Sequence, residues 1–524
     1  MPSEMVARGL ARRTLIALLA AAPALSCGGA SKPALRPAAE AAKLTPAPKP
    51  APAEVEVSAP AVALDSEPER SVPSDGMSQA HEERALSDEA LEARYPLYGV
   101  AFQALAQVFE KPDVNSFVIG LMRRGTTLRA SAPITTAMKG HGCEGTWHEL
   151  WTRGFICRGR GFQLGKTPQT FTPSPAPASL YDPLPYPYAK NTAKLALQYF
   201  RLPTPQEETE SEASYAAAKA LLDEAAAKQP AVPPLATEAE DDLADAGQTV
   251  PLPALVRMAM APGFYVSVDG LEQAGERTFA RTVRGAYVAA DALSDVTLPK
   301  QAGGVLGPSE QLPLGIVYRE GAKVSDRDPV SGQLIERGAL SRYARVPLAG
   351  GGPVDTVGSL MTRSGQLIQG SKLRRAEPVA WPALVPKGAR LIHVRLAEQT
   401  LVAYEGRRAV YATLVSSGKE GFETPTGLFR IHAKHVSTTM DGLAGEEDEY
   451  SIEDVPWTLY FQGSFALHAA FWHDRFGNTR SHGCLNLSPA DARWLFEWAT
   501  PTLPSGFHSA MANRENPGTY VLID

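Results

Sequence analysis

The amino-acid sequence predicts a mainly β, multidomain protein that begins with a long unfolded segment. Its 524 residues are too many for one ordinary hydrophobic core. The predicted strands are short and broken by glycine, and the 44 prolines gather in a few stretches. The composition, 44% hydrophobic and 21% charged, suits globular domains. A net charge of −6 gives no basic footprint, so we expect no nucleic-acid partner.

Residues 1–27 have the features of an export signal. Several arginines precede the short apolar run 14–25, and small residues and Cys27 follow it. The run is too short for a membrane-spanning helix, which needs about 20 apolar residues. The segment resembles a bacterial lipoprotein signal, which implies lipidation of Cys27 and anchoring to a membrane. A secretory signal cut elsewhere, with loss of Cys27, is the alternative. Both place the protein in the cell envelope or periplasm.

Residues 28–92 are rich in Ala, Pro, Glu and Ser and contain no aromatic residue. Such a segment cannot bury enough apolar area to fold, so we expect a disordered tether. Its prolines predict a semi-extended spacer.

A first β module is expected over residues 93–166. Its strand-like runs are short and separated by glycines, which is typical of a small antiparallel barrel or sandwich. The run 145–165, GTWHELWTRGFICRGRGFQLG, resembles bacterial SH3-like wall-associated modules. Cys143 and Cys157 lie fourteen residues apart across a predicted hairpin, which in an exported protein favours a disulfide. Two free thiols are the alternative.

Residues 167–249 are expected to be a connector, and residues 250–386 to return to β structure. The connector combines a proline-punctuated stretch, a predicted helix over 208–229 and an acidic spacer. The stretches 281–293 and 361–373 both place Gly eight residues before Leu. This frame indicates either a repeat of small β modules, SH3-like as in the first module, or coincidental hairpin chemistry.

A last domain, residues 387–524, is expected to be a β-sandwich or barrel-like unit. The runs LIHVRL, TLVAYEG and AVYATLVSSG predict consecutive strands, and ETPTGLFRIHAK continues them. Ser488 and Pro489 predict the start of a short helix, with Ser488 as the N-cap.

Cys484 has the surroundings that a thiol nucleophile needs. An ordinary cysteine has a pKa of about 8.5, so it needs an imidazole to become a thiolate at neutral pH. His468 lies sixteen residues upstream, at the end of a predicted strand. Gly483 allows the backbone to approach a substrate carbonyl, and the amides around Gly483 and Cys484 would stabilise the oxyanion.

The run Ser481-His482-Gly483-Cys484-Leu485-Asn486 with His468 before it resembles the signature of the L,D-transpeptidase (YkuD-like) catalytic domains of bacterial cell-wall enzymes. So do Gly418-Lys419 and the run 424–427, Thr-Pro-Thr-Gly. The resemblance covers roughly residues 390–524. It leaves open which backbone carbonyl orients His468, because alanine follows the histidine where the family usually has Gly or Ser.

The resemblance implies a reaction on peptidoglycan stem peptides. Cys484 would attack a tetrapeptide stem, release D-alanine and leave a thioester, which the amine of a second stem resolves into a 3→3 cross-link. His468 would be the base. His482 would shape the pocket, while Ser481 and Asn486 would hold the loop. The resemblance implies no metal and no cofactor.

Other readings of these residues stay open. His473, Trp457, Tyr460 and Arg480 are candidate substrate contacts, although a satisfied loop histidine and two core aromatics are more common outcomes. Zinc ligation by His468, His473, His482 and Cys484 is disfavoured, because the spacings match no closed zinc pattern.

Three other functions remain open for the whole chain. Water or a free D-amino acid could resolve the thioester, which would make the protein an L,D-carboxypeptidase or exchange enzyme. A lysine of an outer-membrane protein could be the acceptor. A non-enzymatic wall-binding lipoprotein is the third reading, against which the intact Cys484 and His468 argue.

Overall fold

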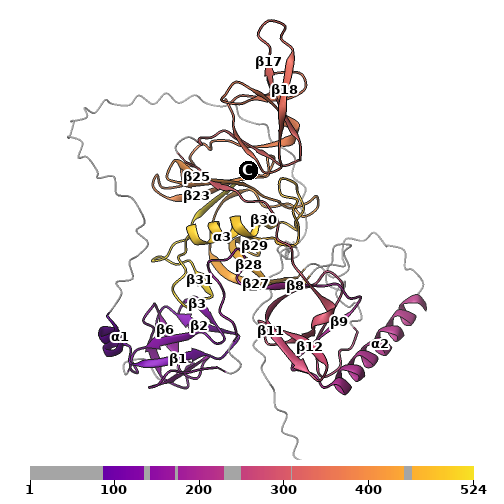
Figure 1. Ribbon diagram of the computed structural model, residues 1–524. Coiled ribbons are helices and arrows are strands. Elements are labelled where there is room, and N and C mark those ends of the chain that lie inside the picture. Colours follow the sequence, from indigo (N-terminus) through magenta and orange to yellow (C-terminus); the bar gives the residue numbers. More distant parts are fainter. Residues whose placement is uncertain (1–86, 135–141, 172–174, 229–249, 308–309, 442–450) are drawn as a thin grey trace, which may run out of the picture. The chain divides into compact units, whose positions relative to one another are not determined.

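The computed structural model describes residues 87–134, 142–171, 175–228, 250–307, 310–441 and 451–524 (Figure 1). Strands dominate these ranges, whose α-helices are α1 (Asp88–Arg94), α2 (Pro205–Lys228) and α3 (Pro489–Trp498). The expected mainly β, multidomain class is therefore confirmed. The predicted signal, the anchor at Cys27 and most of the predicted tether lie outside the described residues. No described helix is long and apolar enough to cross a membrane.

Helix α1 departs from the expected tether, which was to run to residue 92. Ser87 accepts a hydrogen bond from the backbone N–H of Ala90 at 3.3 Å, as an N-cap does. Asp88 and Glu89 lie in the first turn and Arg94 in the last turn, where each charge favours the helix dipole. These end signals stabilise a short helix in a segment whose polar composition predicts disorder.

The first module consists of two small sheets around one core. The sheets have the strand orders β4-β1-β7 and β3-β2-β6-β5. Ala101, Val108, Met122 and Phe162 are buried between them. Cys143 and Cys157 form a disulfide, the pairing that the sequence predicts. The strands are β1 (Leu97–Ala101), β2 (Leu105–Phe109), β3 (Val118–Arg123), β4 (Thr127–Ala130), β5 (Trp147–Glu149), β6 (Phe155–Cys157) and β7 (Phe162–Gly165).

The second module is assembled from two separate parts of the chain. Strands β8 and β9 precede helix α2, and β10 to β14 follow it. Together they form the order β10-β9-β13-β12-β11, with β8 beside β11 and β14. Residues 188–199 are therefore strands of a β module, whereas the sequence predicted them to belong to a connector. The strands are β8 (Tyr188–Asn191), β9 (Ala196–Tyr199), β10 (Val256–Met260), β11 (Tyr265–Ala274), β12 (Arg277–Thr282), β13 (Tyr287–Ala289) and β14 (Leu293–Asp295).

The third module occupies residues 314–376. It holds a three-stranded sheet, β19-β16-β22, and a four-stranded sheet, β18-β17-β21-β20. Val317, Leu348, Leu360, Ile368 and Leu373 are buried in its core. The strands are β16 (Leu314–Val317), β17 (Ala322–Arg327), β18 (Leu334–Leu340), β19 (Arg345–Pro347), β20 (Ser359–Met361), β21 (Leu367–Gln369) and β22 (Leu373–Ala376).

The glycine–leucine frame of the sequence marks the same local structure in the second and third modules. In each, a strand turns at a glycine with positive φ, Gly285 or Gly365, and a second strand follows. A 3₁₀ turn, 290–292 or 370–372, then leads into the strand that begins with the frame's leucine. This repeated element order favours repetition over coincidence. The SH3-like character of the modules stays a prediction.

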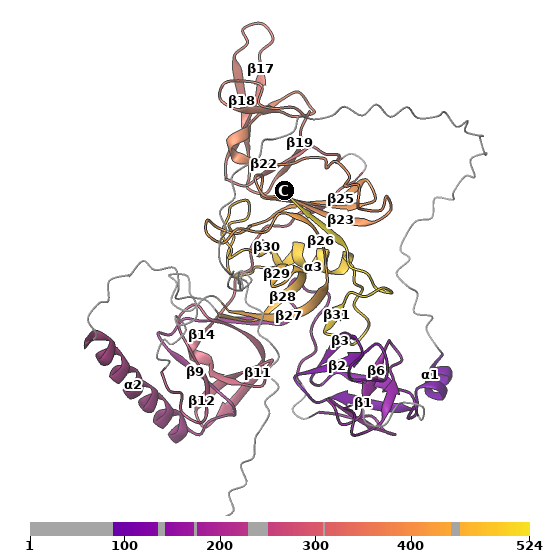
Figure 2. The same cartoon turned by 180° about the vertical axis from the view of Figure 1, so that it is seen from behind.

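The C-terminal domain is a sandwich with a helix against its core. One sheet has the order β15-β25-β24-β23-β32-β26, and strands β27 to β30 form the other face. Helix α3 contributes Ala492, Leu495 and Phe496 to the core (Figures 1 and 2). The strands are β15 (Gly304–Val305), β23 (Arg390–Arg395), β24 (Thr400–Glu405), β25 (Arg408–Leu414), β26 (Gly427–Arg430), β27 (Ala433–Asp441), β28 (Ser451–Gln462), β29 (Phe465–Ala469), β30 (Leu485–Leu487), β31 (Ser509–Met511) and β32 (Tyr520–Ile523).

This domain follows the sequence prediction closely. The predicted strand runs correspond to β23, β24, β25 and β26, and Ser488 accepts the backbone N–H of Asp491 as the N-cap of α3. One addition was not predicted: β15, from the segment between the second and third modules, pairs with β25.

Strands of the C-terminal domain also pair with strands of the first two modules. Gly120 in β3 pairs with Ala510 in β31, and Tyr265 in β11 pairs with Ile452 in β28. The proline-rich segment 175–187 crosses the same surface: the carbonyl oxygen of Pro183 accepts the indole N–H of Trp457 at 2.6 Å. The segment expected to be an irregular connector thus packs on the C-terminal domain.

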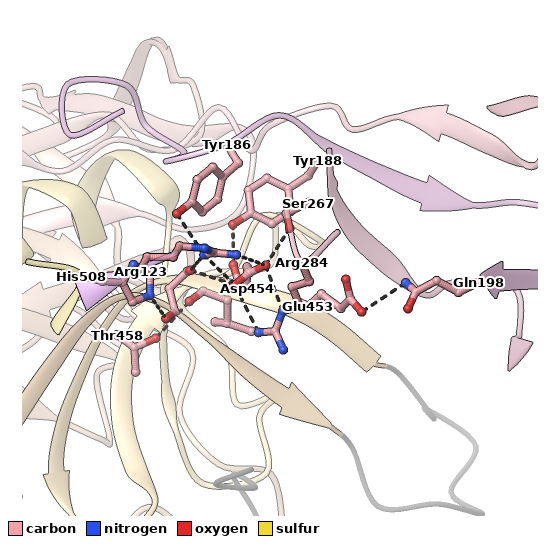
Figure 3. A network of polar contacts seen from close by, with 12 residues as sticks. Arg123, Tyr186, Tyr188, Gln198, Ser267, Arg284, Glu453, Asp454, Thr458 and His508 are labelled. Carbon is pink, nitrogen blue, oxygen red and sulfur yellow. Dashed lines mark hydrogen bonds and ion pairs between the residues drawn. The ribbon is translucent and has the colours of Figure 1, made fainter. Parts of the chain in front are cut away.

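A buried cluster of charges, the Asp454 cluster, joins these three units (Figure 3). The carboxylate of Asp454, with a side chain only 2% exposed, binds Arg123 of the first module and Arg284 of the second. The guanidinium groups pull the pKa of Asp454 well below its usual value, against the effect of burial. Its further partners are the hydroxyls of Ser267 and Ser437. Each unit thereby supplies part of one buried ionic site, in which two guanidinium groups share one carboxylate.

Candidate active site

The two candidate catalytic residues lie on neighbouring parallel strands. His468 is near the end of β29, and Cys484 directly precedes β30. The strands pair with Leu467 opposite Leu485 and His468 opposite Asn486. Both leucines point into the core with α3. Because side chains alternate along a strand, His468 and Asn486 point to the opposite face, and the same alternation puts Cys484, one residue before β30, on that face diagonally across from His468.

Cys484 is enclosed by its surroundings. Its side chain is 1% exposed and packs in an apolar cluster with Phe471 and Tyr188. The sulfur lies 3.8 Å from the carbonyl oxygen of Ser464. In this structure the sulfur is disulfide-bonded, so the candidate nucleophile is the thiol that reduction releases.

A backbone carbonyl fixes the tautomer of His468. Nδ1 lies 3.1 Å from the carbonyl oxygen of Ala469. Since a carbonyl can only accept a hydrogen bond, Nδ1 carries the proton and Nε2 keeps its lone pair. Burial lowers the pKa of His468 to about 4, so the ring is neutral at neutral pH. A neutral imidazole with Nε2 unprotonated is the form that a general base needs. The carbonyl left open by the sequence is that of Ala469.

The hydroxyl of Ser481 stabilises the turn that carries Cys484. Ser481 Oγ donates to the carbonyl oxygen of Cys484 and accepts the N–H of Gly483 at 3.1 Å. Gly483 has φ of 109°, and a Cβ there would lie 2.5 Å from the ring of Phe465. Both the conformation and the close packing therefore require glycine.

A second segment fixes this turn from the side. Thr424 Oγ1 donates to the carbonyl oxygen of Gly483 at 2.8 Å and accepts the N–H of Gly418 at 3.0 Å. Gly418 bridges to Ser481, and Ser416 bridges to Asn486. The Gly-Lys and Thr-Pro-Thr-Gly parts of the sequence motif thus lie against the Cys484 turn.

His473 is a satisfied histidine that supports the site. Its Nδ1 accepts the N–H of Arg475 at 3.3 Å, and burial lowers its pKa to about 3, so the ring is neutral and Nε2 carries the proton. The side-chain amide of Asn486 lies 3.0 Å from that Nε2. The amide atom at that distance is Nδ2; because two N–H donors cannot bond each other, the reverse amide orientation, with Oδ1 toward Nε2–H, satisfies both groups and gives Asn486 Oδ1 a partner.

The remaining candidate residues have other surroundings. Trp457 and Tyr460 are each 1% exposed and belong to the core. Arg480 is half-buried, and its backbone N–H donates to Ser417 at 2.8 Å. His482 is 6% exposed, with its ring edge-on to Phe422 at 4.7 Å. Of the four predicted substrate contacts, only Arg480 therefore has a partly exposed side chain, since His473 is 9% exposed.

Two supporting residues were not anticipated from the sequence. Gln399, at φ of 51°, donates to Ser417 Oγ at 2.6 Å and accepts the N–H of the same residue at 2.9 Å. Asp491, in the first turn of α3, accepts hydrogen bonds from the hydroxyls of Tyr411 and Thr413, each at 2.7 Å. A glutamine in a strand-to-strand turn gives no sequence signal, whereas an acid three residues after an N-cap serine, close behind the Cys484 motif, is visible in the sequence.

Within the described residues, no three or more His, Cys, Asp and Glu side chains are arranged to hold a metal ion. The zinc reading of His468, His473, His482 and Cys484 gains no support from this geometry.

The buried histidines predict a loss of stability in acid. Burial lowers the pKa of His435 and His468 to about 4 and that of His473 and His508 to about 3. In the unfolded chain these histidines have pKa values of about 6.5, so between about pH 6.5 and 4 they bind protons in the unfolded state but not in the folded state. Stability is therefore complete above pH of about 6.5 and falls as the pH drops toward 4, by about 1.4 kcal/mol per pH unit for each histidine.

Denaturant unfolding across this pH range measures the effect, and His508→Gln should flatten the slope by about one histidine's share. A pH-independent unfolding midpoint in the wild type would contradict the prediction.

Comparisons with known proteins agree with this geometry. Residues 389–523 match the family model of the YkuD L,D-transpeptidase catalytic domain. The chain is 31% identical over 90 residues to L,D-transpeptidase 2 of Mycobacterium tuberculosis, covering 16% of this chain and 22% of that protein. It is 27% identical over 119 residues to the putative L,D-transpeptidase YciB of Bacillus subtilis, covering 20% and 59%. The matched region is thus less than two thirds of either relative.

Solved structures of L,D-transpeptidases are also similar. One from Mycobacterium smegmatis has 17% identity and a TM-score of 0.22, covering 49% of this chain and 99% of that one. One from Stackebrandtia nassauensis has 22% identity and a TM-score of 0.19, covering 26% and 57%.

Proposed function

We propose that this protein is an exported peptidoglycan L,D-transpeptidase that forms 3→3 cross-links through a thioester on Cys484. The observation that carries the proposal is the placement of Cys484 and His468 on one face of two paired strands, inside the region that matches the family model. The export signal in the sequence supports a site of action in the cell envelope, and the lipoprotein-like Cys27 supports membrane anchoring.

The first half of the reaction transfers an acyl group to the enzyme. His468 Nε2 takes the thiol proton of Cys484, and the sulfur attacks the carbonyl that precedes the terminal D-alanine of a tetrapeptide stem. The carbon–nitrogen bond breaks, the imidazolium gives its proton to the leaving amine, and D-alanine departs. Backbone amides of the Cys484 turn would stabilise the tetrahedral oxyanion.

The second half returns the enzyme to its starting state. The side-chain amine of an acceptor stem attacks the thioester carbonyl while His468 removes the proton that the nitrogen must lose. The carbon–sulfur bond breaks, a new amide forms, and the thiolate recovers a proton from the imidazolium. His473 and Asn486 keep the strand pair in place and take no part in the bond changes.

Product analysis tests the proposal. The reduced full-length protein is incubated with purified disaccharide-tetrapeptide, and the products are identified by mass spectrometry. We expect D-alanine together with a dimer that carries a 3→3 bond. Tripeptide without dimer would instead identify an L,D-carboxypeptidase that uses the same thioester, and an unchanged tetrapeptide would contradict both.

A further inference from the structure

The loop between the two catalytic residues is held by hydrogen bonds from the third module. This loop, residues 470–480, connects β29 with the Cys484 turn. Asp474 in the loop accepts a hydrogen bond from the hydroxyl of Tyr343 at 2.5 Å. Arg342 bonds the Asp474 carboxylate at 3.3 Å and its backbone carbonyl at 2.5 Å. Arg342 and Tyr343 both belong to the third module, in the connection between β18 and β19.

Tyr343 is held in a conformation that a bulky residue rarely adopts. Its φ is 69°, in the left-handed region, where a side chain with Cβ is disfavoured. Its backbone N–H donates to the carbonyl oxygen of Val317 at 2.7 Å, and its side chain packs against the apolar cluster that contains Phe476 of the loop. Strained residues of this kind persist where their surroundings fix them, and they gather at functional positions.

A second contact holds the other end of the loop. Arg374 in β22 of the third module donates to the carbonyl oxygen of Gly477 at 2.8 Å. A Cβ on Gly477 would lie 2.7 Å from the side chain of Tyr318, so the loop backbone lies directly on the third module. The two contacts fix the loop on either side of Phe476.

The same loop also contacts His468 directly and Asn486 in the neighbouring strand. Trp472 stacks on the ring of His468 with 5.8 Å between ring centroids. His473, next to Asp474, bonds Asn486, which lies opposite His468 in the strand pair. A shift of Asp474 would therefore reach His468 both through the indole and through β30.

We propose that Asp474 is a positioning residue, through which Arg342 and Tyr343 of the third module set His468 against Cys484. The inference rests on the proposed function in so far as these two residues are the catalytic pair. The competing explanation is an ordinary surface ion pair, because the side chains of Arg342 and Asp474 are 28% and 40% exposed. Such pairs contribute little to stability and nothing to chemistry at a distance.

Cysteine reactivity distinguishes the two explanations without any peptidoglycan substrate. Asp474→Asn and Tyr343→Phe are compared with wild type and with Glu336→Gln, which removes a carboxylate from an exposed ion pair of the same module. The rate of alkylation of Cys484 by iodoacetamide is measured on the reduced full-length chain, by peptide mapping, across the pH range in which thiols titrate. Turnover of disaccharide-tetrapeptide and thermal unfolding are recorded in parallel.

We expect both test variants to alkylate about 10-fold more slowly near neutral pH, because a displaced His468 takes the thiol proton less effectively as the sulfur attacks. Turnover should fall in kcat with KM unchanged, Glu336→Gln should match wild type, and the double variant should be no slower than either single one. Alkylation profiles that superimpose on wild type would overturn the proposal.

Two further results would separate the positioning role from the proposed function and from a folding defect. If wild type leaves the tetrapeptide untouched while the alkylation rates still separate, the proposed function fails and the positioning role stands. If Asp474→Asn does not fold, Tyr343→Phe decides, since it keeps the ring and removes only the hydroxyl.

Discussion

Cys484→Ala is expected to abolish both D-alanine release and cross-link formation. The alanine has no sulfur on which the thioester could form, and no other cysteine of the described residues lies near the strand pair, because Cys143 and Cys157 are bonded to each other in the first module. Loss of a nucleophile costs a factor of about 10⁶ in a well-studied case, so turnover should fall below detection. Mass spectrometry of the disaccharide-tetrapeptide reaction measures it.

His468→Gln should lower turnover by about 10²- to 10⁴-fold, the usual contribution of a general base. The amide cannot take the thiol proton as the sulfur attacks, so only the fraction of Cys484 that is already ionised reacts. The variant's remaining activity should rise with pH as the thiol ionises without help.

A matched control is the double variant Cys143→Ser, Cys157→Ser. It removes two sulfurs that belong to the first module, and the variant should lose stability while its folded fraction keeps its activity. Turnover in Cys484→Ala at the wild-type rate would refute the nucleophile assignment.

The C-terminal domain was predictable because its information is local. Alternating apolar runs give β23 to β26, and the Ser488 cap and Pro489 give the start of α3. Cys484 could be proposed as the nucleophile because the residues around it form a contiguous motif. The register of β29 against β30, which places His468 opposite Asn486, is a contact between two strands and cannot be deduced from the motif alone.

What the sequence did not show is contact over long separations. The second module joins β8 and β9 to strands that follow helix α2, so composition alone divided it into a connector and a module. The hydrogen bond between Tyr343 and Asp474 joins residues 131 positions apart in the sequence, and that between Arg123 and Asp454 joins residues 331 positions apart. Neither residue type nor spacing announces such pairs, because an isolated arginine or tyrosine reads as an ordinary surface residue.

Among the variants considered, Asp454→Ala is expected to lower the free energy of unfolding the most. Removing one partner of a buried ion pair typically costs about 3–5 kcal/mol, because the remaining charge stays buried without compensation. Here two guanidinium groups, those of Arg123 and Arg284, would be left in that state, and their side chains are only 14% and 29% exposed. Glu336→Ala is the matched control: it breaks the exposed pair with Lys323, which should cost less than about 1 kcal/mol.

The form of the loss should reveal what the cluster does. Asp454 lies on β28 of the C-terminal domain, whereas its arginine partners belong to the first and second modules. If the cluster couples the three units, calorimetry of the wild type should show them unfolding together, and Asp454→Ala should separate an earlier transition of the upstream modules from that of the C-terminal domain. A loss no greater than that of Glu336→Ala would show that backbone pairing and apolar packing alone hold the units together. Replacing both arginines by methionine in the Asp454→Ala background should restore part of the stability, because apolar side chains of similar length need no counter-charge.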